Sequence, residues 1–166
     1  MSRPYLTGWI GALLLILTTG LSHAGPPEAY RFLPLNEAAQ QAENTGKPML
    51  LYFGRYGCTT CRKMHAEVFT DPLVFERYSQ QFALAYVDTE SANRIRLANG
   101  ERTTEMQYAS RNRILGTPTF VFFSPQQKPL FKKAGFQSIE QMKQYADFIV
   151  GGHYAEMTLT DYLAQQ

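Results

Sequence analysis

The sequence contains two cysteines separated by two residues, a residue type and spacing that can carry out thiol–disulfide chemistry. Cys58 and Cys61 are its only cysteines, and Thr59 and Thr60 lie between them. The first turn of a helix carries unpaired N–H groups and a positive dipole end, which favour a thiolate over a thiol. If a helix begins here, Cys58 is the more exposed and more ionised thiol. The pattern therefore indicates disulfide exchange, with Cys58 attacking and Cys61 resolving the mixed disulfide.

Two other interpretations of the cysteine pair are open. A structural disulfide closing so short a loop would remove little entropy from the unfolded chain. A metal site is the stronger alternative, because Cys58 and Cys61 with His65 and His153 could ligate zinc or copper. Nothing in the sequence places His153 near the cysteines, and His65 alone is typical of a solvated or packing histidine. We therefore predict redox chemistry with no cofactor and no metal, and keep a metal-binding or metallochaperone module as the alternative.

Residues 1–24 have the pattern of a secretory signal peptide. Arg3 precedes an apolar segment, 8–21, that is shorter than the roughly 20 residues needed to span a bilayer. Ser22 and Ala24 place small residues three before and directly before a cut. We predict cleavage after Ala24, which leaves a domain of residues 25–166 in the periplasm. Disulfides form and persist in such a compartment, so redox chemistry is available to the cysteines there.

The composition is that of a globular protein and does not indicate a nucleic-acid-binding one. The 166 residues suit one domain, and the 45% hydrophobic and 18% charged residues are typical of a globular chain. The formal net charge is only +2, which gives no electrostatic reason to expect nucleic acid as a partner.

Helical and strand patterns alternate along the predicted domain. The apolar run 49–53 is typical of a strand buried on both faces, and Asn99-Gly100 is a hairpin-turn signal. The order predicts an α/β domain, a mixed central sheet flanked by helices with an inserted hairpin. The expected elements are helix 37–44 capped by Asn36, strand 49–53, helix 59–69, helix 72–80 capped by Asp71, strand 82–87, hairpin 95–103, helix 104–112, strands 119–123 and 130–133, helix 139–149 with Ile139 turned inward, and helix 158–164.

A second chemical signal is the segment Gly116-Thr117-Pro118, directly before a predicted strand. Proline at the start of a central strand is awkward unless it serves a turn, and a cis peptide bond is the usual reason to keep it. We therefore predict a cis bond between Thr117 and Pro118.

Taken together, these segments resemble the thioredoxin superfamily. The resemblance rests on residues 47–53, on Cys58 to Cys61, on Val87-Asp88 and on residues 116–120. More narrowly, the chain is similar to exported thioredoxins of the sulfur-oxidation (Sox) type. That likeness rests on residues 61–65 and 69–72, the inserted hairpin and the segments 152–154 and 161–163.

The resemblance implies a thioredoxin-like fold, with Cys58 as nucleophile and Cys61 as resolving thiol. It also implies that Thr117 and Pro118 bind substrate, the Thr117 backbone pairing with a substrate peptide. It further implies reduction of disulfide-bearing protein substrates, with a membrane thiol-reductase as electron donor; an oxidant or isomerase is the alternative.

Two residues depart from the pattern of the superfamily. Gly57 stands where thioredoxins usually have tryptophan, and Tyr52 stands where they often bury an acidic residue that assists proton transfer. Water, or an acid such as Glu67, would then have to carry the proton.

Overall fold

The computed structural model describes residues 25–166. The predicted signal peptide lies outside the described residues. Within residues 25–166, no helix has the length and apolar character needed to cross a bilayer.

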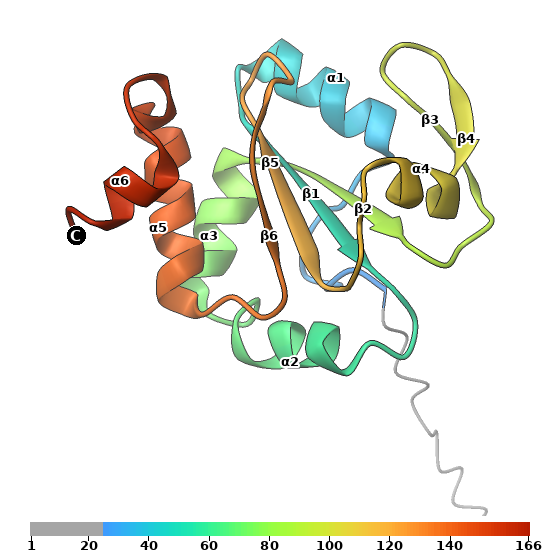
Figure 1. Ribbon diagram of the computed structural model, residues 1–166, viewed down its shortest axis with the longest axis horizontal. Coiled ribbons are helices and arrows are strands. Elements are labelled where there is room, and N and C mark those ends of the chain that lie inside the picture. The colour runs from blue at the N-terminus through green and yellow to red at the C-terminus, as the bar shows by residue number, and fades with distance from the viewer. Residues whose placement is uncertain (1–24) are drawn as a thin grey trace, which may run out of the picture.

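A four-stranded mixed sheet forms the centre of the domain, with strand order β2-β1-β5-β6 (Figure 1). A separate two-stranded hairpin, β3-β4, is the predicted insertion. The strands are β1 (Met49–Gly54), β2 (Ala83–Asp88), β3 (Arg94–Arg96), β4 (Arg102–Thr104), β5 (Thr119–Phe123) and β6 (Pro129–Ala134). The helices are α1 (Leu35–Thr45), α2 (Thr59–Glu67), α3 (Pro72–Gln81), α4 (Glu105–Arg111), α5 (Ile139–Val150), the 3-10 turn η1 (His153–Ala155) and α6 (Leu159–Leu163).

Strand β1 runs through the middle of the sheet, and all six of its residues are buried. It pairs in parallel with β2 and antiparallel with β5. Alternate side chains of a strand point to opposite faces, so Leu50 and Tyr52 enter one core while Leu51 and Phe53 enter the other. The predicted strand buried on both faces is confirmed.

Helices cover both faces of the sheet. Helices α1 and α4 lie on one side, and α2, α3 and α5 lie on the other, with α2 across the end of the sheet (Figure 1). Small residues let α1 pack close to the strands: Ala38, Ala39 and Ala42 are all buried. The predicted mixed sheet flanked by helices is therefore confirmed.

Most predicted helix boundaries hold because their caps form. Asp71 caps α3, and capping boxes form at Thr104 and at Ser138. The predicted cap at Asn36 is wrong, because α1 already begins at Leu35, whose side chain is buried in the core. Ile139 was expected to point inward but is 36% exposed, since the first turn of α5 emerges from the core.

Candidate active site

The two cysteines form a disulfide at the beginning of α2. Strand β1 ends at Gly54, and a turn over residues 55–57 leads to Cys58. Gly57 has φ +71, a left-handed conformation that glycine adopts without steric cost. This conformation accounts for glycine at the position where the superfamily usually has tryptophan. The turn brings Cys58 to the N-cap of α2, as the sequence predicts.

A backbone donor in the first turn of α2 points at the sulfur of Cys58. The N–H of Cys61 donates to Sγ of Cys58 at 3.0 Å, so the first turn of the helix can stabilise a thiolate there. Cys58 is 4% exposed and Cys61 is 0% exposed. The expected order of exposure is therefore confirmed: Cys58 is the sulfur that another molecule reaches first, while Cys61 lies behind it.

The segment before β5 lies against the disulfide. The peptide bond between Thr117 and Pro118 is cis, as predicted. The carbonyl oxygen of Thr117 is 3.4 Å from Sγ of Cys58. The hydroxyl of Thr119 donates to the carbonyl oxygen of Gly116 at 2.7 Å and holds the turn. The structure thus brings Cys58, Cys61, Thr117 and Pro118 to one edge of the sheet; their roles in catalysis and substrate binding remain predictions.

A cavity of about 510 Å³ opens beside Thr117. Leu115 on its rim is 97% exposed, and Tyr56 on the neighbouring turn is 66% exposed. Arg55 and Glu90, also on the rim, form an ion pair at 3.0 Å. The residues that line the cavity are Arg55, Thr89, Glu90, Ile114, Leu115, Gly116 and Thr117. The surface beside the disulfide is therefore open and partly apolar, which suits a polypeptide. No local pattern in the sequence indicates that Leu115 is exposed.

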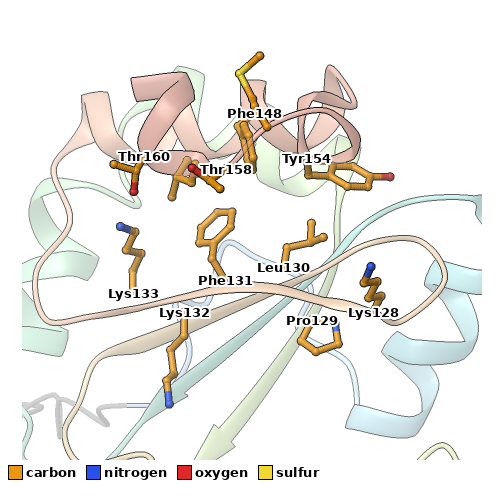
Figure 2. A pocket seen from close by; sticks show the side chains of 12 residues that line it. Lys128, Pro129, Leu130, Phe131, Lys132, Lys133, Phe148, Tyr154, Thr158 and Thr160 are labelled. Carbon is orange, nitrogen blue, oxygen red and sulfur yellow. The ribbon is translucent and has the colours of Figure 1, made fainter. Parts of the chain in front are cut away.

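A second cavity, of about 430 Å³, lies between β6 and the segment that follows α5. Figure 2 shows Leu130 and Phe131 facing Tyr154 and Thr158 across it. Lys132 points away, and its Nζ donates to carbonyl oxygens at the end of α4. None of the four predicted site residues lines this cavity, so it is separate from the disulfide.

Tyr52 of β1 meets His65 of α2, the helix that begins at the disulfide. The Tyr52 hydroxyl is 2.9 Å from Nε2 of His65. Burial, followed by the nearby Tyr86, raises the pKa of Tyr52 far above its ordinary value, so the phenol stays protonated. Burial also lowers the pKa of His65, which favours a neutral ring at neutral pH. The sequence predicts a solvated or packing histidine at position 65. It does not predict the hydrogen bond to Tyr52.

Glu67, the acid suggested from the sequence as a proton carrier, follows Cys61 by six residues, about 9 Å along the axis of α2. Glu67 has an exposed side chain at the end of α2, with Oε2 3.9 Å from Nζ of Lys63. Tyr52, at the position where the superfamily often has an acid, is completely buried.

Metal ligation by the cysteines would need further ligands close to them. Among residues 25–166, no group of three or more His, Cys, Asp or Glu side chains is placed to hold a metal ion. His153, which the metal alternative required, lies in η1 with its ring 5.0 Å from that of Tyr162. The structure therefore does not bring together the ligand set that the sequence suggested.

A disulfide-bonded cysteine pair at the start of the helix after a central strand, beside a cis-proline at the end of a mixed sheet, defines a thioredoxin-like fold with a redox-capable site. Residues 35–149 match the thioredoxin-like domain, and the chain belongs to this family. Family membership and the Cys58–Cys61 pair together fit a thiol:disulfide oxidoreductase.

Three known proteins illustrate the likeness. The chain is 30% identical over 135 residues to the thiol:disulfide interchange protein DsbD 1 of Pseudomonas aeruginosa, a match that covers 72% of this chain and 21% of that protein. The chain thus spans about a fifth of that relative. A thioredoxin-fold protein from Helicobacter pylori superposes with a TM-score of 0.65 at 19% identity, covering 78% of this chain and 96% of that one. A thioredoxin from Thermus thermophilus gives 0.63 at 25% identity, covering 77% and 94%.

Proposed function

We propose that this chain is a periplasmic thiol:disulfide oxidoreductase that reduces disulfides in protein substrates. The observation that carries the proposal is the position of Cys58: its sulfur accepts from the first turn of α2 and lies 3.4 Å from the Thr117 carbonyl oxygen. A reactive thiolate therefore has a helix terminus to stabilise it and an adjacent backbone edge on which a peptide can lie.

The reaction follows from this arrangement. The Cys58 thiolate attacks one sulfur of a substrate disulfide, and the other substrate sulfur leaves as a thiolate. The Cys61 thiolate then attacks Sγ of Cys58, the mixed disulfide breaks, and the second substrate sulfur leaves as a thiolate. The substrate gains two electrons and two protons, and Cys58 and Cys61 become a disulfide. Thr117 and Pro118 hold the substrate chain beside Cys58 while these exchanges occur.

Repeated turnover needs an external dithiol reductant. A membrane thiol-reductase is the partner that we propose, because the chain is similar to part of a thiol:disulfide interchange protein. The similarity to exported Sox-type thioredoxins at residues 61–65 and 69–72 supports the reducing direction and the export of the chain. The reduction potential decides the direction: about −270 mV is typical of a reductant, and about −120 mV of an oxidant. A reduction potential near −120 mV, measured against glutathione, would show that the protein is an oxidant and would contradict the reducing direction.

Paired cysteine variants test the chemistry. Wild type should reduce insulin disulfides with dithiothreitol as electron source, and Cys58→Ser should lose this activity entirely. Cys61→Ser should instead accumulate a mixed disulfide, visible by mass spectrometry under non-reducing conditions. Full activity of Cys58→Ser, or tight stoichiometric zinc or copper binding without any disulfide turnover, would contradict the proposal.

The location needs its own measurement. The full chain, expressed in a Gram-negative host, should be recovered from the periplasmic fraction with Gly25 as its first residue. Recovery in the cytoplasm with residues 1–24 intact would contradict the export that we propose.

A further inference from the structure

Cys61 poses a problem of proton removal. It is completely buried, and burial in apolar surroundings favours the neutral thiol over the thiolate. Only the thiolate can attack the mixed disulfide at Cys58. Resolution at neutral pH therefore requires a base within reach of the Cys61 sulfur.

The inner face of α2 carries a candidate for this base, His65. His65 follows Cys61 by four residues, so the two side chains are neighbours on one face of the helix, with about 5–6 Å between their Cβ atoms. The burial pattern agrees: Cys61, Met64 and Val68 are buried, and His65 is half-buried beside them. Such a separation lets a thiol pass its proton to an imidazole directly or over one water molecule.

Tyr52 fixes the orientation of the His65 ring. Its hydroxyl is hydrogen-bonded to Nε2, and its own ring stacks on Phe120 with centroids 5.0 Å apart. When Nε2 donates its proton to the Tyr52 oxygen, Nδ1 keeps a free lone pair and can accept a proton. A tyrosine that is completely buried in the central strand thus holds the histidine in one position.

The surroundings of His65 disfavour the charged ring, because burial lowers the pKa of the imidazole. Two aromatic rings pack against that of His65: Tyr52 from β1 and Phe69 beyond the end of α2, with centroids 5.8 and 5.9 Å away. Tyr86 of β2 lies behind Tyr52, with its ring 5.3 Å away and its own pKa raised by burial. The charged side chains of the same helix, Arg62, Lys63 and Glu67, are exposed. Lys63 and Glu67 pair with each other, and Arg62 donates to the hydroxyl of Thr59.

We propose that His65, oriented by Tyr52, accepts the Cys61 proton during resolution of the mixed disulfide, an inference that rests on the proposed function. The thiol proton moves to His65, the Cys61 thiolate attacks Sγ of Cys58, and the bond from Cys58 to the substrate sulfur breaks. The departing substrate thiolate takes the proton from the imidazolium, which restores neutral His65. The external dithiol that reduces the Cys58–Cys61 disulfide closes the cycle. Tyr52 is a positioning residue in this scheme.

Ellman's reagent, a small aromatic disulfide, separates the two halves of the reaction. Mixed with the reduced full chain in a stopped-flow instrument, it releases one thionitrobenzoate when Cys58 attacks and a second when Cys61 resolves. We expect His65→Ala to slow the second phase about 100-fold at pH 7, within the usual range for general-base catalysis, and to change the first phase less than twofold. His153→Ala, which removes the other histidine of residues 25–166, is the matched control and should change neither phase.

The pH profile distinguishes a base from a packing residue. In wild type the second phase should fall as pH drops through the lowered pKa of His65 and be level above it. In His65→Ala the rate should rise with pH throughout the neutral range, and added imidazole should restore part of the lost rate at pH 7. Tyr52→Phe keeps the ring and removes the hydroxyl, so it should slow the second phase about 10-fold; this variant decides the question if His65→Ala does not fold.

The outcomes separate this inference from the proposed function. If the first phase is normal and the rate of the second phase is unchanged in both His65→Ala and Tyr52→Phe, the role of His65 is wrong. The proposed function is not affected by that outcome. The same follows if the wild-type pH profile persists in His65→Ala. A wild-type chain that releases no thionitrobenzoate at all would overturn the proposed function and the inference with it.

Discussion

The carbonyl oxygen of Thr117 lies 3.4 Å from Sγ of Cys58, although 59 positions separate the two residues. Sheet register produces this proximity. Strands β1 and β5 are antiparallel, and Phe53 pairs with Thr119, so the end of β1 adjoins the start of β5. The segment that continues from β1 to Cys58 therefore meets the segment that enters β5 from Thr117. The central pairing of the sheet assembles the candidate site.

Exposed Leu115 provides a test of polypeptide recognition. Its side chain is 97% exposed beside the cavity next to Thr117, so it contributes little to the core. We expect Leu115→Ser to lower kcat/KM for insulin about tenfold, the lower end of the effect of one lost apolar contact. Ellman's reagent is too small to span this surface, so its rate should not change. Equal loss for both substrates, or none for either, would contradict a docking role. Leu73→Ser, an exposed leucine on α3, serves as the matched control.

The start of α3 depends on one carboxylate. Oδ1 of Asp71 accepts from the backbone N–H groups of Leu73 and Val74, each at 3.0 Å. Asp71→Ala leaves both donors without this acceptor and should lower the free energy of unfolding by about 1 kcal/mol. Urea titration followed by circular dichroism measures the change. Asp71→Asn keeps a capping oxygen and should lose much less; equal losses in the two variants would show that the side chain does not act as a cap.

Gly54 is the last residue of β1, and its lack of a side chain leaves room for Tyr86. A Cβ atom at position 54 would lie 2.8 Å from Cε2 of Tyr86, which is closer than real contacts allow. We expect Gly54→Ala to destabilise the fold by about 1–3 kcal/mol through overpacking. Tyr86→Leu shortens the opposing side chain, so the double variant should be more stable than the sum of the single losses predicts. Strict additivity in urea titrations would show that the two residues do not crowd each other.

Local signals in the sequence predicted most elements correctly. The apolar run 49–53 identified the central strand, Asn99-Gly100 identified the hairpin, and Cys58 identified the start of α2, because each depends on residues close in the chain. The cap at Asn36 failed because burial of Leu35 determines where α1 begins, which no local pattern reveals.

The site was only partly predictable for the same reason. The spacing of Cys58 and Cys61 and the proline at position 118 are local features. The hydrogen bond between Tyr52 and His65 joins a strand to a helix across the core. One clue to it was present in the sequence: His65 is one turn after Cys61. Only the tertiary packing shows that the two side chains meet.

The lowered pKa of His65 also predicts how stability depends on pH. Burial disfavours the charged ring in the folded state, whereas in the unfolded chain His65 titrates near its ordinary value of about 6.5. Below that pH the unfolded chain binds a proton that the folded chain resists, so the contribution of His65 is present above pH 6.5 and is lost as pH falls.

Urea titrations of the oxidised chain between pH 7.5 and 5 measure this dependence. We expect the free energy of unfolding of wild type to fall over this range and that of His65→Gln, which carries no titrating ring, to fall less. The difference between the two proteins isolates His65 from other groups that titrate below pH 6. His153→Gln should follow wild type. The free energy of unfolding could instead depend on pH with the same slope in His65→Gln and in wild type. The ring would then be as easily protonated in the folded chain as in the unfolded one, and the inference of a neutral imidazole beside Tyr52 would be wrong.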